Sequence, residues 1–367
     1  MNRPNSSLCA PYLSLKTCFS EILLLSNRSQ KAATGNETKS TDSLLSYIDL
    51  ALWRTVPPVL LVCGAFGNVM TIVVMRGMRT GLSNPSMSQY FIALAVSDTF
   101  ILFNDLLRQW LKYAFAIDIE PLHAATCKIL RFASHTSAMT SAWFLIAMTY
   151  QRVMSVLLPH RVGVICTARR GKLVIAVVVI FCSLMNAQFL YTFSRTTSPS
   201  AKTEYKCDVI PNKLARFYIN HVHSWIDLFF TSLFPFFFLM IGNGLLVNGL
   251  TKSMRQTVSM TVTASGQTRL QKNKVSSLTI TLILTSLTFL MLTSPNGVMD
   301  LYEESIKVNT LAGNEMLDPS FNEPLRLADT AGRLLWFTNS AVNFFLYCMK
   351  GKKFRTELRR RFCRNTQ

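Results

Sequence analysis

Residues 173–189 read LVIAVVVIFCSLMNAQF and carry no charged side chain. With its flanks this run covers 171–194, and a helix of about 20 residues crosses a bilayer core about 30 Å thick. Further apolar runs of this length recur at 53–76, 87–111, 124–155, 217–250, 272–302 and 326–349. Period-2 alternation, which is typical of a membrane β-barrel, is absent. The sequence therefore predicts an all-α membrane protein, a bundle of seven transmembrane helices.

The overall composition agrees with a membrane protein. Of the 367 residues, 50% are hydrophobic and 16% are charged, and the mean hydropathy is +0.28. Soluble domains usually contain about 25% charged residues, and disordered chains have low hydrophobicity. The formal net charge of +19 would suggest a nucleic-acid partner only if it were spread over a soluble surface.

The basic residues instead gather in alternate links between the predicted spans. The links after the first, third and fifth spans, and the tail after the seventh, are rich in Lys and Arg and contain one acid, Glu357. An excess of Lys and Arg marks the cytoplasmic side of a membrane protein. We therefore expect a multi-pass plasma-membrane protein with an extracellular N-terminus, a cytoplasmic C-terminus and no nucleic-acid partner.

The N-terminal segment 1–50 is polar and precedes the predicted bundle at 51–350. It holds every N-glycosylation sequon of the chain, at Asn5, Asn27 and Asn36. This clustering predicts a glycosylated extracellular segment. Residues near the N-terminus lack the apolar core of a signal peptide, so the first span is expected to direct membrane insertion.

The C-terminal segment 351–367 begins with GKKFRTELRRRF. Phe354, Leu358 and Phe362 recur at helical spacing among basic residues, which predicts a short amphipathic helix. Such a helix suits a surface of anionic lipids. Cys363 follows directly and is a candidate for palmitoylation.

Four cysteines lie on the predicted outer side. Cys127 starts the third span and Cys207 lies in the link 195–216, so a disulfide between them would tie that link over the bundle. The loop-entropy estimate for such a bond is roughly 4–5 kcal/mol. Cys9 and Cys18 can pair with each other, although the sequence leaves their connectivity open.

An acid inside an apolar span points to function, because intramembrane charge is costly. Asp98 lies mid-span, and several polar residues are expected at the same depth: Ser141, Asn339, Ser340 and Asn343. Either these groups simply hold the carboxyl, or together they bind a proton or an ion such as sodium. No other cofactor, no metal-ligand pattern and no catalytic motif is recognisable, so an enzyme is not expected.

Several motifs fall in a fixed order along the chain: Gly67-Asn68, LAVSD at Leu94–Asp98, Cys127, Arg152, Pro159, Pro235, Phe289, Pro295 and NFFLY at Asn343–Tyr347. This order resembles the rhodopsin-like (class A) G-protein-coupled receptors, and more closely the invertebrate neuropeptide receptors, including those for FMRFamide-like peptides. The resemblance implies that a ligand enters from outside between the helices and that a heterotrimeric G protein binds inside. The switch residues it implies are Gln151, Arg152, Phe289, Pro295 and Tyr347.

The chain departs from the family pattern at positions that usually hold the inactive state. Gln151 replaces the usual acid before Arg152, Thr293 replaces the usual Trp, and Phe344 replaces the usual Pro. A carboxylate would pair with Arg152, whereas Gln151 offers only a neutral hydrogen bond. We therefore expect appreciable basal signalling.

Polar residues in the outer half of the spans are the ligand-binding candidates: Arg108, Arg131, His135, Gln188, Asp227, Asp300, Glu304, Arg333 and Trp336. The acidic link after span six is either a solvated loop or a rim that attracts a basic, amidated peptide. Arg131 and Arg333 would then hold peptide carbonyls, or a carboxylate if the ligand is acidic. Asp105 and Arg108, three residues apart, can neutralise each other.

Two other classes of membrane protein deserve comparison. A transporter or ion channel can have seven helices and an intramembrane acid, but transporters tend to show inverted repeats, and none is recognisable here. A retinal-binding pump or photoreceptor needs a lysine within span seven for the Schiff base, and 326–349 contains none.

Overall fold

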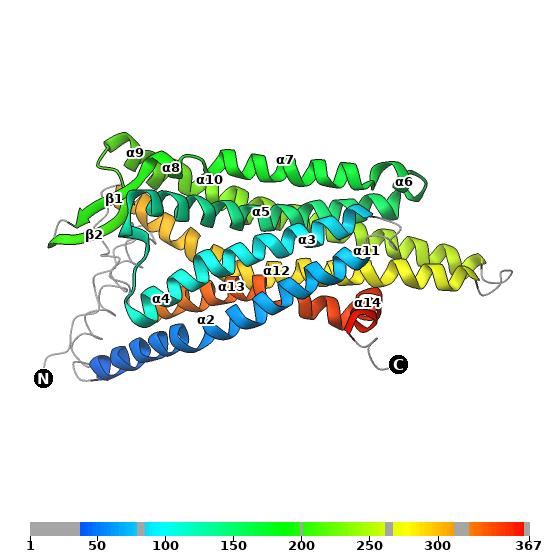
Figure 1. Ribbon diagram of the computed structural model, residues 1–367, viewed down its shortest axis with the longest axis horizontal. Helices are drawn as coiled ribbons and strands as arrows, with labels where there is room; N and C mark the ends of the chain where they lie inside the picture. The colour runs from blue at the N-terminus through cyan, green and yellow to red at the C-terminus, as the bar shows by residue number, and fades with distance from the viewer. Residues whose placement is uncertain (1–36, 79–84, 199–200, 261–266, 312–322, 363–367) are drawn as a thin grey trace, which may run out of the picture.

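The computed structural model describes residues 37–78, 85–198, 201–260, 267–311 and 323–362 (Figure 1). Its longest helices are α2 (Glu37–Met78), α5 (Ala124–Leu157), α7 (Ala168–Asn186), α11 (Phe234–Met260), α12 (Gln267–Leu311) and α13 (Glu323–Lys350). The predicted sequons Asn5, Asn27 and Asn36, together with Cys9, Cys18 and Cys363, lie outside the described residues.

Two of the membrane-crossing rods are assembled from consecutive helical segments. The second rod joins α3 (Pro85–Phe100), the π-helix η1 (Ile101–Leu106) and α4 (Leu107–Phe115). The fifth joins α9 (Lys213–Phe217), the π-helix η4 (Tyr218–His223), α10 (Ser224–Asp227) and the π-helix η5 (Leu228–Leu233) to α11. Each of these π-helices lies between two α-helical segments of its rod.

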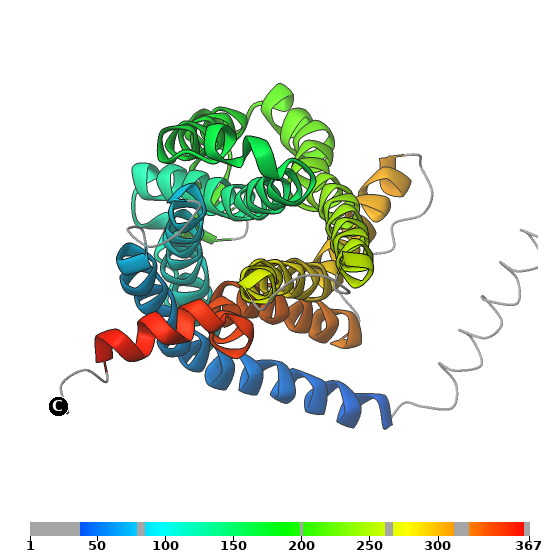
Figure 2. The same cartoon turned by 90° about the vertical axis from the view of Figure 1, so that its right-hand side faces the viewer.

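The seven rods form a ring when the molecule is viewed end-on (Figure 2). Helix α5 contacts α3, α7 and α11, while α13 packs against both α2 and α12 and closes the ring. Each predicted apolar run falls on one of these rods, so the predicted seven-helix bundle is confirmed.

The seven rods are not equally apolar. Five helical segments of the described chain are long and apolar enough to span a membrane, and the bent pair of α5 with η3 (Pro159–Arg161) and α6 (Val162–Ile165) makes a sixth. Helix α13 falls outside this set, because it carries the buried polar residues Asn339, Ser340 and Asn343. These side chains face the interior of the ring, where an intramembrane helix can place polar groups at least cost.

One end of the ring, called here the hairpin end, is covered by short elements. They are η2 (Glu120–Leu122), α8 (Phe189–Thr192), β1 (Phe193–Ser198) and β2 (Ala201–Val209). The strands pair antiparallel, with Phe193 opposite Val209. Both of these residues are buried in a cluster with Cys127. The sequence predicted no strands in the link 195–216, because two isolated strands become stable only through such packing.

The predicted disulfide is confirmed. It joins Cys127 at the start of α5 to Cys207 in β2 and so fastens the hairpin to the bundle.

Several helices extend beyond the apolar runs. Helix α2 begins at Glu37, and α11 and α12 cover most of 251–271, which separates the apolar runs 217–250 and 272–302. Hydropathy marks only the part of a helix inside the bilayer. The backbone hydrogen bonds of the helix continue into water, where polar side chains are tolerated.

The other end, called here the α14 end, carries the predicted short helix α14 (Lys352–Phe362). Its apolar face is divided. The Phe354 ring is buried and lies edge-on to those of Phe344 and Tyr347, at centroid distances of 5.8 and 5.9 Å, whereas Phe362 is exposed. Part of the face that the sequence assigned to lipid therefore packs on the bundle.

Candidate functional site

A cavity of about 500 Å³ opens at the hairpin end, enclosed by the second, third, fifth, sixth and seventh rods and by Phe193 of β1. The predicted ligand residues that line it are Arg108, Arg131, His135, Asp227, Asp300, Arg333 and Trp336. Gln188 is not among the lining residues and accepts a hydrogen bond from the Tyr218 hydroxyl at 3.1 Å. The side chain of Glu304 lies outside the described part of the structure.

A π-helix shapes the wall on the second rod. The wider turn of η1 places Asp105 against α5, where its carboxylate accepts a hydrogen bond from the Ser134 hydroxyl. Asn104 donates to the same hydroxyl at 2.8 Å. Short π segments inside helices are frequent at functional sites, and this one could not be foreseen from the sequence.

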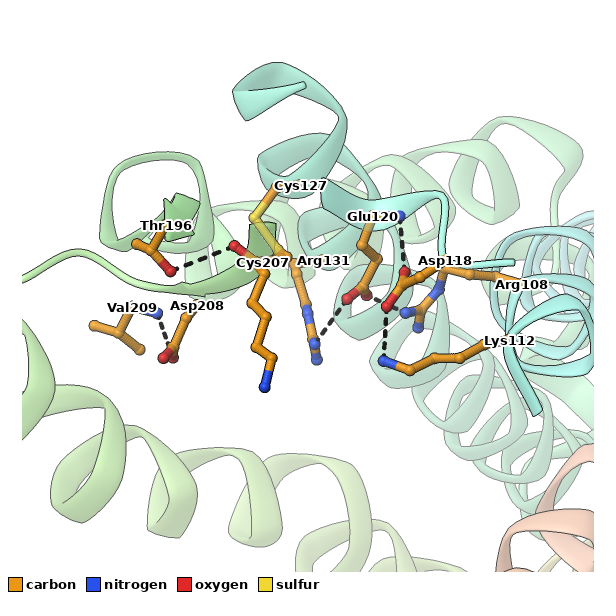
Figure 3. Close-up of a disulfide and its surroundings, with 11 residues drawn as sticks. Arg108, Lys112, Asp118, Glu120, Cys127, Arg131, Thr196, Cys207, Asp208 and Val209 are labelled. Carbon is orange, nitrogen blue, oxygen red and sulfur yellow. Dashed lines mark hydrogen bonds and ion pairs between the residues drawn. A yellow bond between two sulfur atoms is a disulfide. The ribbon is translucent and has the colours of Figure 1, made fainter. Parts of the chain in front are cut away.

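Two cavity arginines share one buried carboxylate, as Figure 3 shows. Arg108 pairs with Asp105 at 3.1 Å and with Glu120, and Arg131 pairs with Glu120 at 3.0 Å. Asp105 and Arg108 thus neutralise each other in part, as predicted. Glu120 was missed, because nothing in the sequence shows that the link containing η2 folds inward over the arginines.

The neighbouring acid of that link lies in a different environment. Asp118 pairs with the ammonium of Lys112 at 2.8 Å and is about a third exposed. Burial raises the pKa of Asp118, but hydrogen bonds from Lys112 and from the Glu120 amide, with the charges of Lys112 and Arg108, outweigh it and hold the pKa below its ordinary value. Asp118 is therefore a charged group whose ion pair is with Lys112 and not with either of the two cavity arginines.

The wall between the third and fifth rods is aromatic and histidine-rich. The His135 ring stacks on Phe189 at a centroid distance of 4.3 Å, and its Nδ1 lies 3.5 Å from a carboxylate oxygen of Asp227. The hydroxyl of Thr231 donates to the same oxygen at 3.1 Å. His223, which the sequence analysis did not single out, packs edge-on to Phe189. His135 therefore has partners in the fold and lines the cavity as well.

The remaining wall belongs to the sixth and seventh rods. Arg333 pairs with Asp329 at 2.8 Å, four residues before it on α13. Asp300 on α12 is exposed and accepts a hydrogen bond from the Asn296 amide at 3.0 Å. Each cavity arginine thus faces a carboxylate in the described structure.

A second polar cluster lies deep in the bundle around Asp98, whose side chain is fully buried. Its carboxylate accepts hydrogen bonds from Ser141 and Asn343, both at 2.8 Å, and Ser340 is a further hydrogen-bonding neighbour. The cluster joins α3, α5 and α13. Hydroxyl and carboxylate oxygens are the ligands that hard cations take, so the donor set fits a sodium ion. Asn339 is buried beside it on α13.

A known protein family matches most of the bundle. The sequence profile described as "7 transmembrane receptor (rhodopsin family)" matches residues 67–347, which is more than half of the chain. The chain belongs to this family. The match is to a receptor family and to neither a transporter family nor a channel family.

Two curated relatives are the cysteinyl leukotriene receptors 1 of Sus scrofa and Cavia porcellus. Each is 24% identical to this receptor over 217 residues, which is 59% of this chain. The aligned part spans 62% of each relative's length. Neither relative is an invertebrate neuropeptide receptor, so that part of the resemblance remains a proposal.

The α14 end of the receptor contains Arg152, the last charged residue of α5. Its side chain is 4% exposed, and its Nε and Nη2 atoms have no hydrogen-bond partner among the described residues. Gln151 does not offer it a hydrogen bond. The Gln151 amide donates instead to the Ser86 hydroxyl, which donates to the Cys166 carbonyl at 3.0 Å. Gln151 therefore holds the link after α5 against α3 and leaves Arg152 uncompensated.

The other switch residues predicted for the receptor lie along the interior. Phe289 is buried at the floor of the cavity, and the Thr293 hydroxyl donates to its carbonyl at 2.7 Å. Pro295 lies inside α12, where it removes a backbone donor and where α13 approaches closely at Gly332. Tyr347 is 2% exposed and edge-on to Phe91. The structure thus places these residues between the cavity and the α14 end.

Proposed function

We propose that this protein is a plasma-membrane receptor that binds an extracellular ligand at the hairpin end and activates a heterotrimeric G protein at the α14 end. The observation that carries the proposal is the arrangement of α5, which has a cavity with charged walls at one end and an uncompensated buried arginine, Arg152, at the other. The basic links assign the α14 end to the cytoplasm and the N-terminus to the exterior.

We propose further that the ligand is a basic peptide, most simply an amidated neuropeptide that contains arginine. The cavity arginines are all matched by carboxylates, whereas Asp227 faces the ring of His135 and the hydroxyl of Thr231. The cavity residues and their ion-pair partners therefore include more carboxylates than arginines, and this negative charge favours a cationic ligand by electrostatic complementarity. The resemblance to receptors for FMRFamide-like peptides points the same way.

The curated relatives favour a second candidate. They are named for cysteinyl leukotrienes, and a ligand of that kind would use the aromatic wall around Phe189 and the arginines Arg131 and Arg333. The two candidates differ in the sign of the ligand's charge, so a single charge substitution separates them.

The test is a screen of both ligand classes on cells that express the receptor. Amidated arginine-containing peptides and cysteinyl leukotrienes are applied, with calcium and cyclic AMP as readouts. A peptide response that falls at least tenfold in potency in Asp227→Asn supports the peptide proposal. A leukotriene response with no peptide response contradicts it.

We also propose that Asp98, with Ser141, Ser340 and the amide oxygen of Asn339, binds a sodium ion, while Asn343 orients the carboxylate. Sodium would then stabilise one conformation of the bundle. Peptide affinity in wild type is expected to depend on sodium at constant ionic strength, and the dependence is expected to disappear in Asp98→Asn. A dependence that survives in the variant would contradict the site.

Two covalent modifications and one lipid contact complete the proposal. Glycans are expected at Asn5, Asn27 and Asn36, palmitate at Cys363, and anionic lipids against the basic residues of α14. Digestion with an endoglycosidase, followed by a mobility shift on a gel, tests the first of these.

A further inference from the structure

Glu120 is a carboxylate enclosed by two arginines. Its side chain is 3% exposed, and its two oxygens pair separately, Oε1 with Arg108 on α4 and Oε2 with Arg131 on α5. Two guanidinium groups that converge on one carboxylate form the arrangement with which proteins bind an acidic ligand. In this receptor the carboxylate comes from the chain itself.

The backbone around Glu120 is held in place from several sides. Its amide donates to the side chain of Asp118 at 3.1 Å, and Pro121 follows at the start of η2. The guanidinium of Arg195 on β1 donates to the Leu122 carbonyl at 3.2 Å. The hairpin is fastened by the disulfide and holds this link beside the arginines through the Arg195 hydrogen bond; Figure 3 shows the disulfide near the ion pairs of Glu120.

Both arginines also face the cavity, and each has a guanidinium N–H group that is not used in the contacts described above. Each lines the cavity, and the Nε of each has no hydrogen-bond partner among the described residues. The guanidinium of Arg131 lies over the ring of Phe193, 5.6 Å from its centroid. A ligand carboxylate that reached this wall would therefore find a pair of guanidinium groups beside an aromatic ring.

We propose that Arg108 and Arg131 form a carboxylate-binding site that Glu120 occupies as an internal ligand, and that Glu120 thereby makes the receptor reject acidic ligands. This inference rests on the proposed function, because it assumes that the cavity is the ligand site. Asp105 and Glu120 balance the two arginines in wild type. Without the charge of Glu120 one positive charge remains, and the site becomes open to a carboxylate from the ligand.

The test uses the purified full-length receptor in detergent micelles with two matched probes. The probes are 4-phenylbutyrate, an aromatic carboxylate, and 4-phenylbutyramide, its neutral amide, and their affinities are measured by titration calorimetry. In Glu120→Gln the carboxylate is expected to bind at least tenfold more tightly than to wild type, while the amide binds equally to both. An unchanged carboxylate affinity in the variant would overturn the proposal.

The matched control is Asp118→Asn, which removes the same charge from the same link at a residue that pairs with Lys112 and with neither of the two arginines. It is expected to change the carboxylate affinity less than twofold. A gain as large as that of Glu120→Gln would show a general charge effect and would also overturn the proposal. The double variant Glu120→Gln with Arg131→Gln is expected to lose the gain.

A second variant covers the case in which Glu120→Gln does not fold. In Glu120→Asp the carboxylate is one methylene shorter and cannot reach both arginines at once, so a gain of about threefold is expected, and no gain in the folded protein overturns the proposal. The ligand screen is independent of these probes. A receptor that does not respond to peptides but shows the tenfold gain in carboxylate affinity would contradict the proposed peptide ligand and leave this site supported.

Discussion

Helix α5 carries two arginines whose surroundings differ in one essential respect. Arg131 at the hairpin end pairs with Glu120 at 3.0 Å and lies over the Phe193 ring. Arg152 at the α14 end is buried, and the described residues offer no carboxylate to it. A buried charge with partners holds a structure together, whereas one without partners destabilises the state that buries it. The receptor is therefore fastened at the hairpin end and poised for change at the α14 end.

The largest effect on stability is expected from Arg108→Leu, which removes the ion pairs of Arg108 with Asp105 and Glu120 at the hairpin end. The substitution leaves Asp105 and Glu120 with one fewer cation, and breaking a buried pair costs about 3–5 kcal/mol. The melting temperature of the purified receptor should fall accordingly. Lys112→Gln is the matched control on the same helix, because its pair with Asp118 is exposed and contributes less than about 1 kcal/mol. Equal losses in both variants would refute the comparison.

Arg152→Leu should have the opposite sign. It removes a buried charge that has no compensating carboxylate, so the unliganded receptor should become more stable by roughly 1–4 kcal/mol. Activation of the G protein should be lost at the same time, because the conformations that expose Arg152 lose their advantage. A lower melting temperature in this variant would mean that Arg152 is compensated after all.

Gln151→Glu should make the two ends alike, because it offers Arg152 a carboxylate partner of the kind that Arg131 has in Glu120. A charge-assisted pair of this kind would lower basal second-messenger output about tenfold, which corresponds to about 1.4 kcal/mol. Gln151→Ala serves as the control: it removes the hydrogen bond to Ser86 without adding charge, so basal output should not fall. Equal basal output from wild type and Gln151→Glu would count against the poised state.

The smallest effect is expected at the rim. Glu304→Gln should weaken a basic peptide by less than about 1 kcal/mol, and more at low salt than at high salt, because exposed charges act through a screened field. Dose–response curves at two ionic strengths measure this. Unchanged potency at both would remove the acidic rim from the description of the ligand site.

Much of the candidate site was predictable from the type and depth of its residues. Asp98, Ser141 and Asn343 meet as expected, since intramembrane polar groups must find one another. The roles of Glu120 and of the Gln151 hydrogen bond to Ser86 were not predictable, because the first depends on a link folding back over the bundle and the second on the packing of α5 against α3. No pattern along the chain encodes such a fold.

The class of architecture, the seven crossings and the disulfide could all be predicted from the sequence. Long apolar segments in a bilayer satisfy their backbone hydrogen bonds within one helix, so each crossing can be recognised locally. Only the tertiary structure decided which arginine is paired and which is not. The pairing of Arg131 depends on the hairpin, which holds the Glu120 carboxylate inward, and on the π-helices, which rotate the helix faces. Such contacts between distant segments are set by packing rather than by composition.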